Sequence, residues 1–262
     1  MSDRTTPTIA LVVTSCGRAN LLHRTLTTFS QFNTLAINEA ILIEDGGLDH
    51  DRESVARMLK LDPESLVIIK NEKNFGQIRS IDRAYQAVRS EYIFHCEDDW
   101  EFYNSGFMEV SLSILQADPE IFCVWLRAHN DTNGHPICRE VHQTAGEISY
   151  HLMSKGYKGV WNGFTLNPGL RRRSDCLIIG PYIDLPLAHD LPGRTRITES
   201  DISIHYHRLG YVGAITSFKD GFVRHIGQDH HLANEWEWRS VVWVKNIIRR
   251  FIRIVRIRIR GT

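Results

Sequence analysis

Three consecutive acidic residues, Glu97, Asp98 and Asp99, follow a run suited to a buried strand in the stretch EYIFHCEDDW. Adjacent carboxylates repel and raise one another's pKa unless a positive charge lies between them. Carboxylate oxygens are the ligands that hard divalent cations prefer. The stretch therefore favours a site that gathers a cation, or a ligand that brings one, over the alternative of a solvated acid at a strand end.

The surrounding sequence predicts the elements that position these acids. Short apolar and β-branched runs are typical of buried strands, and they occur at residues 8–14, 40–45, 66–70 and again just before Glu97. Apolar residues at helical spacing predict a helix for which Asn20 is a candidate N-cap, and further helices over residues 52–59 and 78–88. This alternation predicts an α/β fold with a mostly parallel central sheet flanked by helices.

Polar residues gather where these predicted strands end. In sheets of this kind, ligands bind outside the carboxyl ends of the strands. The polar residues at these ends are Thr14, Cys16 and Arg18 after the first strand, Glu44 and Asp45 after the second, and the three acids after the fourth. Three polar strand ends at one edge predict a site there, although Asp45 is also compatible with a simple turn before two glycines.

The glycines match neither of the common nucleotide motifs. No GxGxxG follows the first strand, and no GxxxxGK[ST] occurs anywhere in the chain. This disfavours a dinucleotide-dependent dehydrogenase and a P-loop phosphotransferase. A nucleotide bound here would be held by carboxylates and a metal.

Composition and charge narrow the class further. The formal net charge of zero argues against a general nucleic-acid binder, which needs a basic surface. Five cysteines without a CxxC pair favour reduced thiols. The polar start MSDRTTPT has no signal-peptide core, and no apolar run reaches the length of a membrane span. We therefore expect a cytoplasmic protein.

The order of these motifs resembles the nucleotide-sugar-binding half of GT-A fold glycosyltransferases of the family 2 type. The resemblance covers residues 8–102 closely and residues 174–227 more loosely, and it rests on VVTSCGRANLLHRTL, ILIEDGGLDHD and NFGQIRSIDRAYQAVRSEYIFHCEDDW. It implies a GT-A (Rossmann-like) domain over residues 1–235. The half at residues 1–102 would bind the nucleotide sugar, and residues 103–235 would supply the acceptor site and the catalytic base.

The resemblance implies a role for each acid in binding the donor. Asp99 would coordinate the metal, Mn²⁺ or Mg²⁺, and Asp98 would face the ribose or a metal-bound water. Because side chains alternate along an extended strand, we expect these two aspartates to point in different directions. Glu97 would reach the ribose or an adjacent helix.

The same resemblance implies how the rest of the nucleotide is held. Asp45, or less favourably Glu44, would accept hydrogen bonds from the base. The segment from Thr14 to Arg18, with Cys16 in its middle, would wrap the base. Arg79 would neutralise phosphate or pair with the acids.

The stretch TESDISIHYHRLGY resembles the family's segment that carries the catalytic base. It implies that Glu199 is the base, in place of the family's more common aspartate, with Asp201 as the second choice. One carboxylate suffices to take a proton from an acceptor hydroxyl in a single displacement, which inverts the sugar. The structural alternative is that Thr198 caps a helix whose first turn carries both acids.

Two further parts of the chain are implicated by the resemblance. His225 would join Asp99 in a mixed nitrogen and oxygen site for the metal. Beside the donor sugar, Trp161 and Phe164 would stack on the ring, and Asn162 or Asn167 would bind its hydroxyls. The arginines at residues 171–173 would meet phosphates, although a solvated face is the favoured interpretation of such a run.

The C-terminal segment at residues 236–262 is basic and amphipathic. Lys245 and six arginines between Arg249 and Arg260 alternate with apolar residues. This pattern predicts contact with an anionic membrane surface, with a strand edge or a dimer contact as alternatives. Peripheral attachment to the inner face of a membrane would suit a lipid-linked acceptor.

Taken together, the motifs predict a metal-dependent, inverting glycosyltransferase. The donor would be a nucleotide-diphosphate sugar, most often UDP-linked in similar proteins, and the acceptor a hydroxyl of a glycan or lipid-linked glycan. The first alternative is a nucleotidyltransferase that makes sugar nucleotides, but that class needs a glycine-rich, lysine-bearing loop where this chain has TSCGRAN. The second is a non-catalytic carbohydrate- or lipid-binding module on a degenerate GT-A fold.

Overall fold

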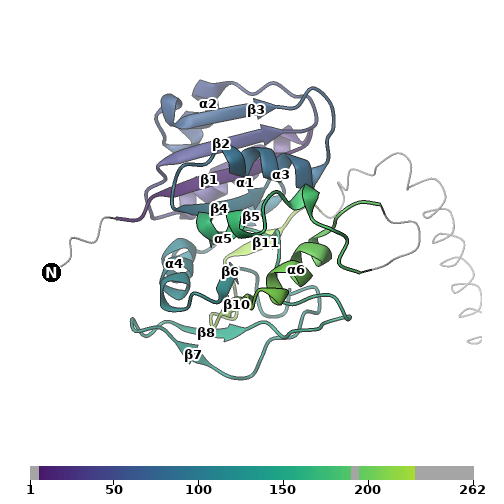
Figure 1. The fold of residues 1–262 in the computed structure, drawn as a ribbon. Coiled ribbons are helices and arrows are strands. Elements are labelled where there is room, and N and C mark those ends of the chain that lie inside the picture. Colours follow the sequence, from purple (N-terminus) through teal and green to yellow (C-terminus); the bar gives the residue numbers. More distant parts are fainter. Residues whose placement is uncertain (1–5, 190–194, 228–262) are drawn as a thin grey trace, which may run out of the picture. The chain divides into compact units, whose positions relative to one another are not determined.

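The computed structural model describes residues 6–189 and 195–227 of the chain, and the described residues as far as Ile226 belong to one compact unit (Figure 1). The strands are β1 (Ile9–Ser15), β2 (Glu39–Glu44), β3 (Leu66–Lys70), β4 (Tyr92–Glu97), β5 (Trp100–Phe102), β6 (Ile121–Trp125), β7 (His142–Gln143), β8 (Ser149–Leu152), β9 (Gly169–Arg172), β10 (Val212–Thr216) and β11 (Val223–His225). The helices are α1 (Ala19–Phe32), α2 (Arg52–Leu59), α3 (Gln77–Ala87), α4 (Phe107–Ala117), α5 (Arg173–Ile178) and α6 (Glu199–Arg208), with 3₁₀ turns η1 (Pro63–Ser65) and η2 (Tyr182–Asp184).

The central sheet has the strand order β3-β2-β1-β4-β9. The first four strands are parallel, and β9 pairs with β4 in the antiparallel direction. Ser15 is in register with Glu44, and Thr14 with Glu97. The carboxyl ends of β1, β2 and β4 therefore meet at one edge, and the predicted mostly parallel sheet flanked by helices is confirmed.

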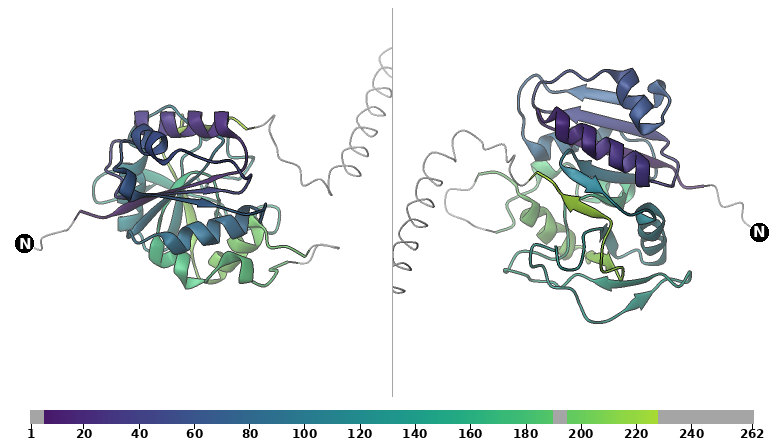
Figure 2. Two further views of the ribbon diagram at one scale, coloured as in Figure 1. Left: turned by 90° about the horizontal axis from the view of Figure 1, so that it is seen from above. Right: turned by 180° about the vertical axis from the view of Figure 1, so that it is seen from behind.

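Alternate residues of β1 face two different hydrophobic clusters. Ile9, Leu11 and Val13 pack with apolar residues of α1, α2 and α4. Ala10 and Val12 pack with residues of α3 and α6 on the other face. Figure 2 shows helices on both sides of the sheet, as this pattern requires. Because both faces are covered, the strands are continuous apolar runs.

Helix α1 begins earlier than the capping pattern predicts. Its N-cap is Arg18, and no side chain caps its first turn. The prediction that Asn20 caps this helix is wrong, because Asn20 already lies within the helix. The early start places Arg18 at the junction between β1 and α1, at the edge where the parallel strands end.

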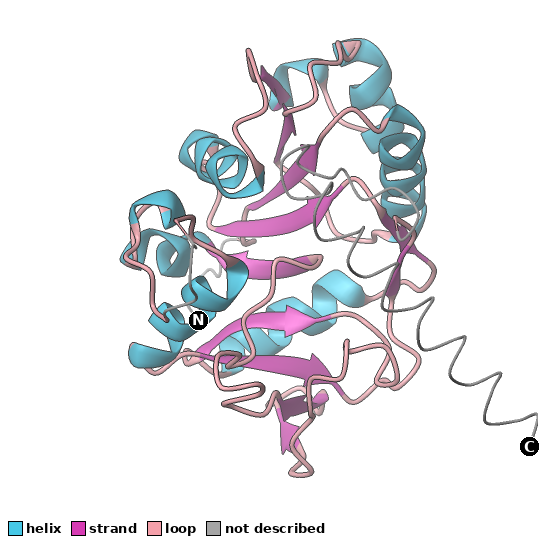
Figure 3. Cartoon of the chain, turned by 90° about the vertical axis from the view of Figure 1, so that its right-hand side faces the viewer, coloured by secondary structure: helices cyan, strands magenta, loops and turns pink. Residues whose placement is uncertain are grey.

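Two smaller sheets complete the described part of the chain (Figure 3). One has the order β6-β10-β8-β7, in which β6 and β10 are parallel. The other pairs β11 with β5 in the antiparallel direction, with His225 opposite Trp100. This short pairing joins a segment near residue 225 to the residues that follow the acidic stretch.

Several predictions fall wholly or partly outside the described residues. The boundary at residue 235 and the basic segment at residues 236–262 lie beyond Gly227, where the described part ends. Among the described helices, none combines the length and the apolar character that crossing a membrane requires. Each of the five cysteines is a free thiol.

Candidate active site

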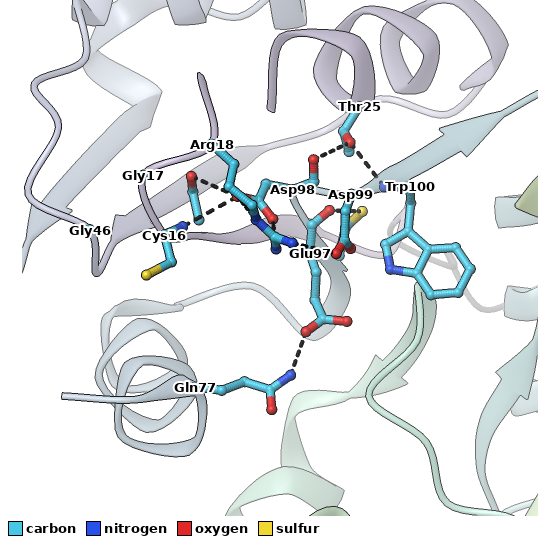
Figure 4. A network of polar contacts seen from close by, with 12 residues as sticks. Cys16, Gly17, Arg18, Thr25, Gly46, Gln77, Glu97, Asp98, Asp99 and Trp100 are labelled. Carbon is cyan, nitrogen blue, oxygen red and sulfur yellow. Dashed lines mark hydrogen bonds and ion pairs between the residues drawn. The ribbon is translucent and has the colours of Figure 1, made fainter. Parts of the chain in front are cut away.

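The acidic stretch forms a turn that helix α1 holds in place. Strand β4 ends at Glu97, and Asp98 and Asp99 lie in the turn before β5. The Thr25 hydroxyl of α1 donates to the Asp98 carbonyl at 2.8 Å and accepts from the Trp100 N–H at 3.1 Å (Figure 4). A buried side chain of α1 therefore fixes the backbone that presents the carboxylates.

Arg18 contacts both aspartates of this turn. Its Nη1 donates to Asp99 Oδ2 at 2.8 Å, and its Nη2 and Nε donate to the two carboxylate oxygens of Asp98. Asp98 also accepts from the Ser15 hydroxyl at 3.0 Å and from the Cys16 N–H at 3.2 Å. Both aspartates reach the same guanidinium although they are neighbours, because they lie in a turn, where the alternation of a strand does not apply.

Asp99 and His225 lie side by side, as the metal prediction requires. His225 Nε2 is 3.2 Å from Asp99 Oδ2, and the Ile226 N–H donates to the Asp99 carbonyl at 2.9 Å. Burial alone would raise the pKa of Asp99, but the hydrogen bond from His225 and the charge of Arg18 outweigh it and lower this pKa. Asp99 is therefore a carboxylate at neutral pH.

The donor atoms at Asp99 fit a divalent cation that shares its coordination with a ligand. Asp99 Oδ1 is buried and has no hydrogen-bond partner. Within residues 6–189 and 195–227, no group of three or more histidine, cysteine, aspartate or glutamate side chains could hold a metal ion. Asp99 and His225 would thus supply two ligands, and phosphate oxygens and waters would supply the others.

Glu97 points from the end of β4 toward helix α3. The Gln77 amide donates to its carboxylate, which matches one of the two options predicted for Glu97 (Figure 4). Burial, together with the negative charges of Asp99 and Glu199, raises the pKa of Glu97 to about 8. Three acids from two distant parts of the chain therefore lie close enough to influence one another.

Glu44 and Asp45 hold the loops that border this edge. Glu44 is fully buried and accepts from the N–H groups of Gly17 at 2.8 Å and Gly46 at 2.6 Å, while His50 Nε2 lies 2.8 Å from its other oxygen. A side chain at Gly46 would collide with the backbone of Gly17, so this close approach of the two loops requires glycine.

Asp45 organises the loop before α3. It accepts from the N–H groups of Phe75 and Gly76, each at 2.8 Å, and from the Asn71 amide at 2.6 Å. Both of its carboxylate oxygens are thus bound to protein donors. Its predicted contact with a nucleotide base stays a prediction.

Thr14 and Cys16 complete the segment after the first strand. Thr14 is buried within β1. The Cys16 thiol accepts from the Asn74 amide at 3.3 Å, and burial with the nearby negative charges of Asp45, Glu44 and Asp98 raises its pKa to about 11. Cys16 is therefore a neutral thiol that contacts the loop before α3.

Glu199 is the first residue of α6 and contacts a loop that precedes β9. Its Oε1 accepts from the Leu166 N–H at 2.6 Å. Burial raises the pKa of Glu199, although this hydrogen bond, a second from Thr165 and the positive charges of Arg171 and Arg127 oppose the rise. A glutamate with a raised pKa beside the acidic turn has the properties of a general base.

Asp201 has a different environment. Its side chain accepts from the Thr198 N–H at 2.9 Å and completes a capping box at the start of α6. It also accepts from the Ala188 N–H at 2.8 Å, lies 3.2 Å from His189 Nδ1, and is fully buried. These contacts are those of the helix-capping alternative.

Two predicted binding residues, Arg79 and Asn162, have contacts away from the acids. Arg79 is exposed on α3 and lines a cavity of about 500 Å³ with Asp82 and Asp184. The pairing of Arg79 with the acids is wrong, since Arg18 and His225 are their partners among the described residues. Asn162 accepts from the Gly156 N–H at 3.0 Å within its own loop.

The aromatic residues of the same region are partly in the core. The Trp161 ring lies 5.2 Å from the His135 ring and is half-buried. Phe164 is buried and stacks with Tyr206 at 5.4 Å. The expectation that Phe164 stacks on a sugar is therefore wrong, because its ring already packs in the core.

Two arginines near Glu199 were not expected there. Arg171 is fully buried and donates to the Thr165 carbonyl at 2.8 Å and the Tyr85 hydroxyl at 2.9 Å, so the interpretation as a solvated face is wrong for this residue. Arg127 is buried, and its guanidinium lies 5.2 Å from the Trp100 ring. Arg127 follows the buried run at residues 121–125. The rule that ligands bind at the carboxyl ends of parallel strands, which we call the strand-end rule, would have found Arg127 if it had been applied to this run.

Comparison with solved structures shows the same fold in several transferases. A mannosyltransferase from Pyrobaculum calidifontis in complex with GDP-Man and Mn²⁺ has a TM-score of 0.55 and 13% identity, covering 80% of this chain and 55% of that one. TarS of S. aureus (residues 1–349) has a TM-score of 0.53 and 12% identity, covering 82% and 59%. GalNAc-T7 with UDP, GalNAc and Mn²⁺ has a TM-score of 0.53 and 13% identity, covering 85% and 44%.

The chain thus spans about half the length of these solved proteins. None of the curated protein sequences matches it. The sequence family described as glycosyl transferase family 2 matches residues 10–172, which run from the second residue of β1 to the end of β9 and include the acidic turn. The predicted GT-A fold is confirmed, and the chain belongs to glycosyl transferase family 2.

Proposed function

We propose that this protein transfers a sugar from a nucleotide-diphosphate sugar, UDP-linked, to a hydroxyl group of an acceptor, with the help of a divalent cation. One observation carries the proposal. The edge of the parallel sheet brings together Asp99 with His225 beside it, and Glu97, whose pKa is raised in part by Glu199. The carboxylate that would bind the metal and a candidate base thus lie at one site.

The chain's own residues would bind the donor as follows. The loop from Ser15 to Arg18 would border the nucleotide, and Glu44 and Asp45 keep this loop and the loop before α3 in place. Asp99 and His225 would hold the cation, with Asp98 toward the ribose or a metal-bound water. When bound, a divalent cation supplies Lewis-acid stabilisation of the negative charge that develops on a leaving diphosphate.

Glu199 would act as the general base. Its pKa is raised by burial, so the carboxylate accepts a proton more readily than an exposed glutamate does. A single displacement with one base inverts the configuration of the sugar. Asp201 would position the start of α6, since its carboxylate is bound by the Thr198 and Ala188 N–H groups.

The acceptor is proposed from the sequence of the basic segment. Its alternating arginines suit an anionic membrane surface on the cytoplasmic side, where a lipid-linked glycan is available. Trp161 and Asn162 would border the sugar-binding side of the site. A glycan or glycolipid hydroxyl is therefore the proposed acceptor.

Titration calorimetry tests the donor proposal. UDP, GDP and UTP are titrated into the protein with and without Mn²⁺. We expect metal-dependent binding of a nucleoside diphosphate, and we expect Asp99→Ala to abolish the metal dependence. A preference for the triphosphate would favour a nucleotidyltransferase, and unchanged binding in Asp99→Ala would remove this residue from the metal site.

A further inference from the structure

The guanidinium of Arg18 neutralises both aspartates of the acidic turn. It donates to both carboxylate oxygens of Asp98 and, at 2.8 Å, to Asp99 Oδ2 (Figure 4). Asp98 is fully buried and Asp99 nearly so, while the Arg18 side chain is 18% exposed. The two acids therefore have a positive partner that belongs to the protein itself.

Arg18 pairs with the same negative carboxylates that a metal ion would bind. Asp99 Oδ2 is within reach of both Arg18 and His225, and only its Oδ1 is without a hydrogen-bond partner. A divalent cation at Asp99 would lie against the guanidinium, and two like charges in a buried site repel strongly. A guanidinium and a divalent cation cannot both keep their full interaction with these carboxylates.

We infer that Arg18 holds the place of the metal in the free protein and couples metal binding to diphosphate binding. A planar guanidinium binds phosphate oxygens in the same forked geometry in which it binds carboxylates. The phosphate oxygens of the diphosphate would accept hydrogen bonds from Arg18, while the cation binds the carboxylates that Arg18 leaves. This inference rests on the proposed function, because it assumes that a diphosphate and a metal bind at this edge.

The position of Arg18 in the chain permits such an exchange. Arg18 is the N-cap of α1 and lies outside the central sheet, while the turn itself is held separately by Thr25. Its side chain can change partners without a change in the backbone that presents the acids. Metal alone should therefore bind weakly, and a nucleoside diphosphate should strengthen metal binding by releasing Arg18.

Calorimetric titration of Mn²⁺, alone and with UDP or GDP, tests the inference in Arg18→Met. We expect this variant to bind Mn²⁺ alone roughly tenfold or more tightly than the unaltered protein. We also expect the gain in Mn²⁺ affinity on adding the diphosphate to fall by a similar factor. The Mn²⁺ affinity of Arg18→Lys should lie between those of Arg18→Met and the unaltered protein, because a single ammonium pairs with one carboxylate at a time.

Arg24→Met is the matched control. Arg24 is on the same helix and pairs with Glu101 at 2.5 Å, so its loss removes one positive charge but leaves the aspartates paired. Mn²⁺ binding in this variant should equal that of the unaltered protein. Circular dichroism and the melting temperature establish that each variant is folded, and Arg18→Lys carries the test if Arg18→Met does not fold.

The two proposals fail in different ways. If Arg18→Met binds Mn²⁺ no more tightly than the unaltered protein, or keeps the whole gain on adding diphosphate, the role of Arg18 is wrong and the proposed function stands. If UDP and GDP bind the unaltered protein without any dependence on Mn²⁺, the proposed function is wrong, and the coupling through Arg18 is wrong with it because such coupling is reciprocal. The arm with metal alone still measures the competition at the acids in that case.

Discussion

Two acids on α6 differ in what surrounds them although they are only two positions apart. One carboxylate oxygen of Glu199 accepts a hydrogen bond from the Leu166 N–H, and burial raises the pKa of Glu199. Asp201 is fully buried and bound to the Thr198 and Ala188 N–H groups. A base must exchange protons with a ligand, whereas a capping carboxylate must keep its charge.

The two carboxylates can be separated by matched amide substitutions. Glu199→Gln should leave donor binding unchanged and lower the turnover number by about 10²–10⁴-fold, the usual contribution of a general base. Asp201→Asn should lower the free energy of unfolding by about 0.5–2 kcal/mol through the lost cap. Calorimetry, turnover assays and urea denaturation measure these effects. Near-normal turnover in Glu199→Gln would assign the base elsewhere.

The raised pKa of Glu97 makes stability depend on pH. An acid with a pKa of 4.5 when unfolded and about 8 when folded binds its proton more tightly in the folded state. Both states are protonated at low pH, so the stabilisation from proton binding is intact below pH 4.5 and is lost as pH rises toward 8. Glu97 therefore destabilises the free protein at neutral and alkaline pH.

Glu97→Gln should remove this pH dependence. As pH rises from 5 to 8, the free energy of unfolding should become larger in the variant than in the unaltered protein, so that the variant is the more stable, by on the order of 1 kcal/mol after allowing for solvent screening. Urea denaturation at several pH values measures the difference. Glu72→Gln, at an exposed position on the loop before α3, is the control. Parallel pH profiles for Glu97→Gln and the unaltered protein would contradict the prediction.

At the scale of elements, a strand edge and a loop together position the candidate base. Arg171 of β9 donates to the carbonyls of Thr165 at 2.8 Å and Asn167 at 3.3 Å. The Leu166 N–H between them binds Glu199. A buried guanidinium thus fixes the loop on which the start of α6 depends, and it also brings a positive charge close to Glu199.

Arg171→Met should loosen this loop. Buried carbonyls that lose their donor cost about 1–3 kcal/mol in the free energy of unfolding. The Leu166 amide, whose hydrogen bond to Glu199 depends on the loop, should exchange its hydrogen faster. Arg139→Met, at an exposed position, should change stability by less than about 0.5 kcal/mol. Unchanged exchange at Leu166 would show that the loop is held by other contacts.

Local sequence patterns predicted most elements of the parallel sheet to within a residue or two. The helix over residues 52–59 and the strand over residues 66–70 have the predicted bounds, because alternation and helical spacing report directly on burial. The strand-end rule also found the acids and Arg18. The predictions of elements and of strand-end residues both rest on features that are close together in the sequence.

The error at Asn20 is a local one, and the errors at Arg79, Phe164 and Arg171 concern contacts between distant residues. Nothing near Arg171 in the sequence shows that Tyr85 and the Thr165 carbonyl would surround a buried guanidinium. The turn at Asp98 is held by Thr25, which is 73 positions away. Arg18 meets both aspartates only because β1 lies beside β4 in the sheet. The local sequence pattern does not show this strand order. Such pairings are fixed by topology, and the sequence alone does not display them.

At the scale of the molecule, the candidate site depends on the whole described fold. Arg18, Asp99, Glu199 and His225 come from the junction between β1 and α1, the turn after β4, α6 and β11. These elements belong to two hydrophobic clusters on opposite faces of the central sheet. A ligand that contacts all four segments binds only the folded chain, so its binding energy adds to the stability of the fold.

Ligand-linked stabilisation is therefore the test that involves the whole molecule. UDP with Mn²⁺, at about 100 times its dissociation constant, should raise the free energy of unfolding by about 2.7 kcal/mol, because only the folded state binds. Thermal and urea denaturation measure the change. Asp99→Ala should show little stabilisation by the pair, and UMP with Mn²⁺ should stabilise less than UDP because it lacks the second phosphate. Equal stabilisation of Asp99→Ala and the unaltered protein would place the nucleotide away from the acidic turn.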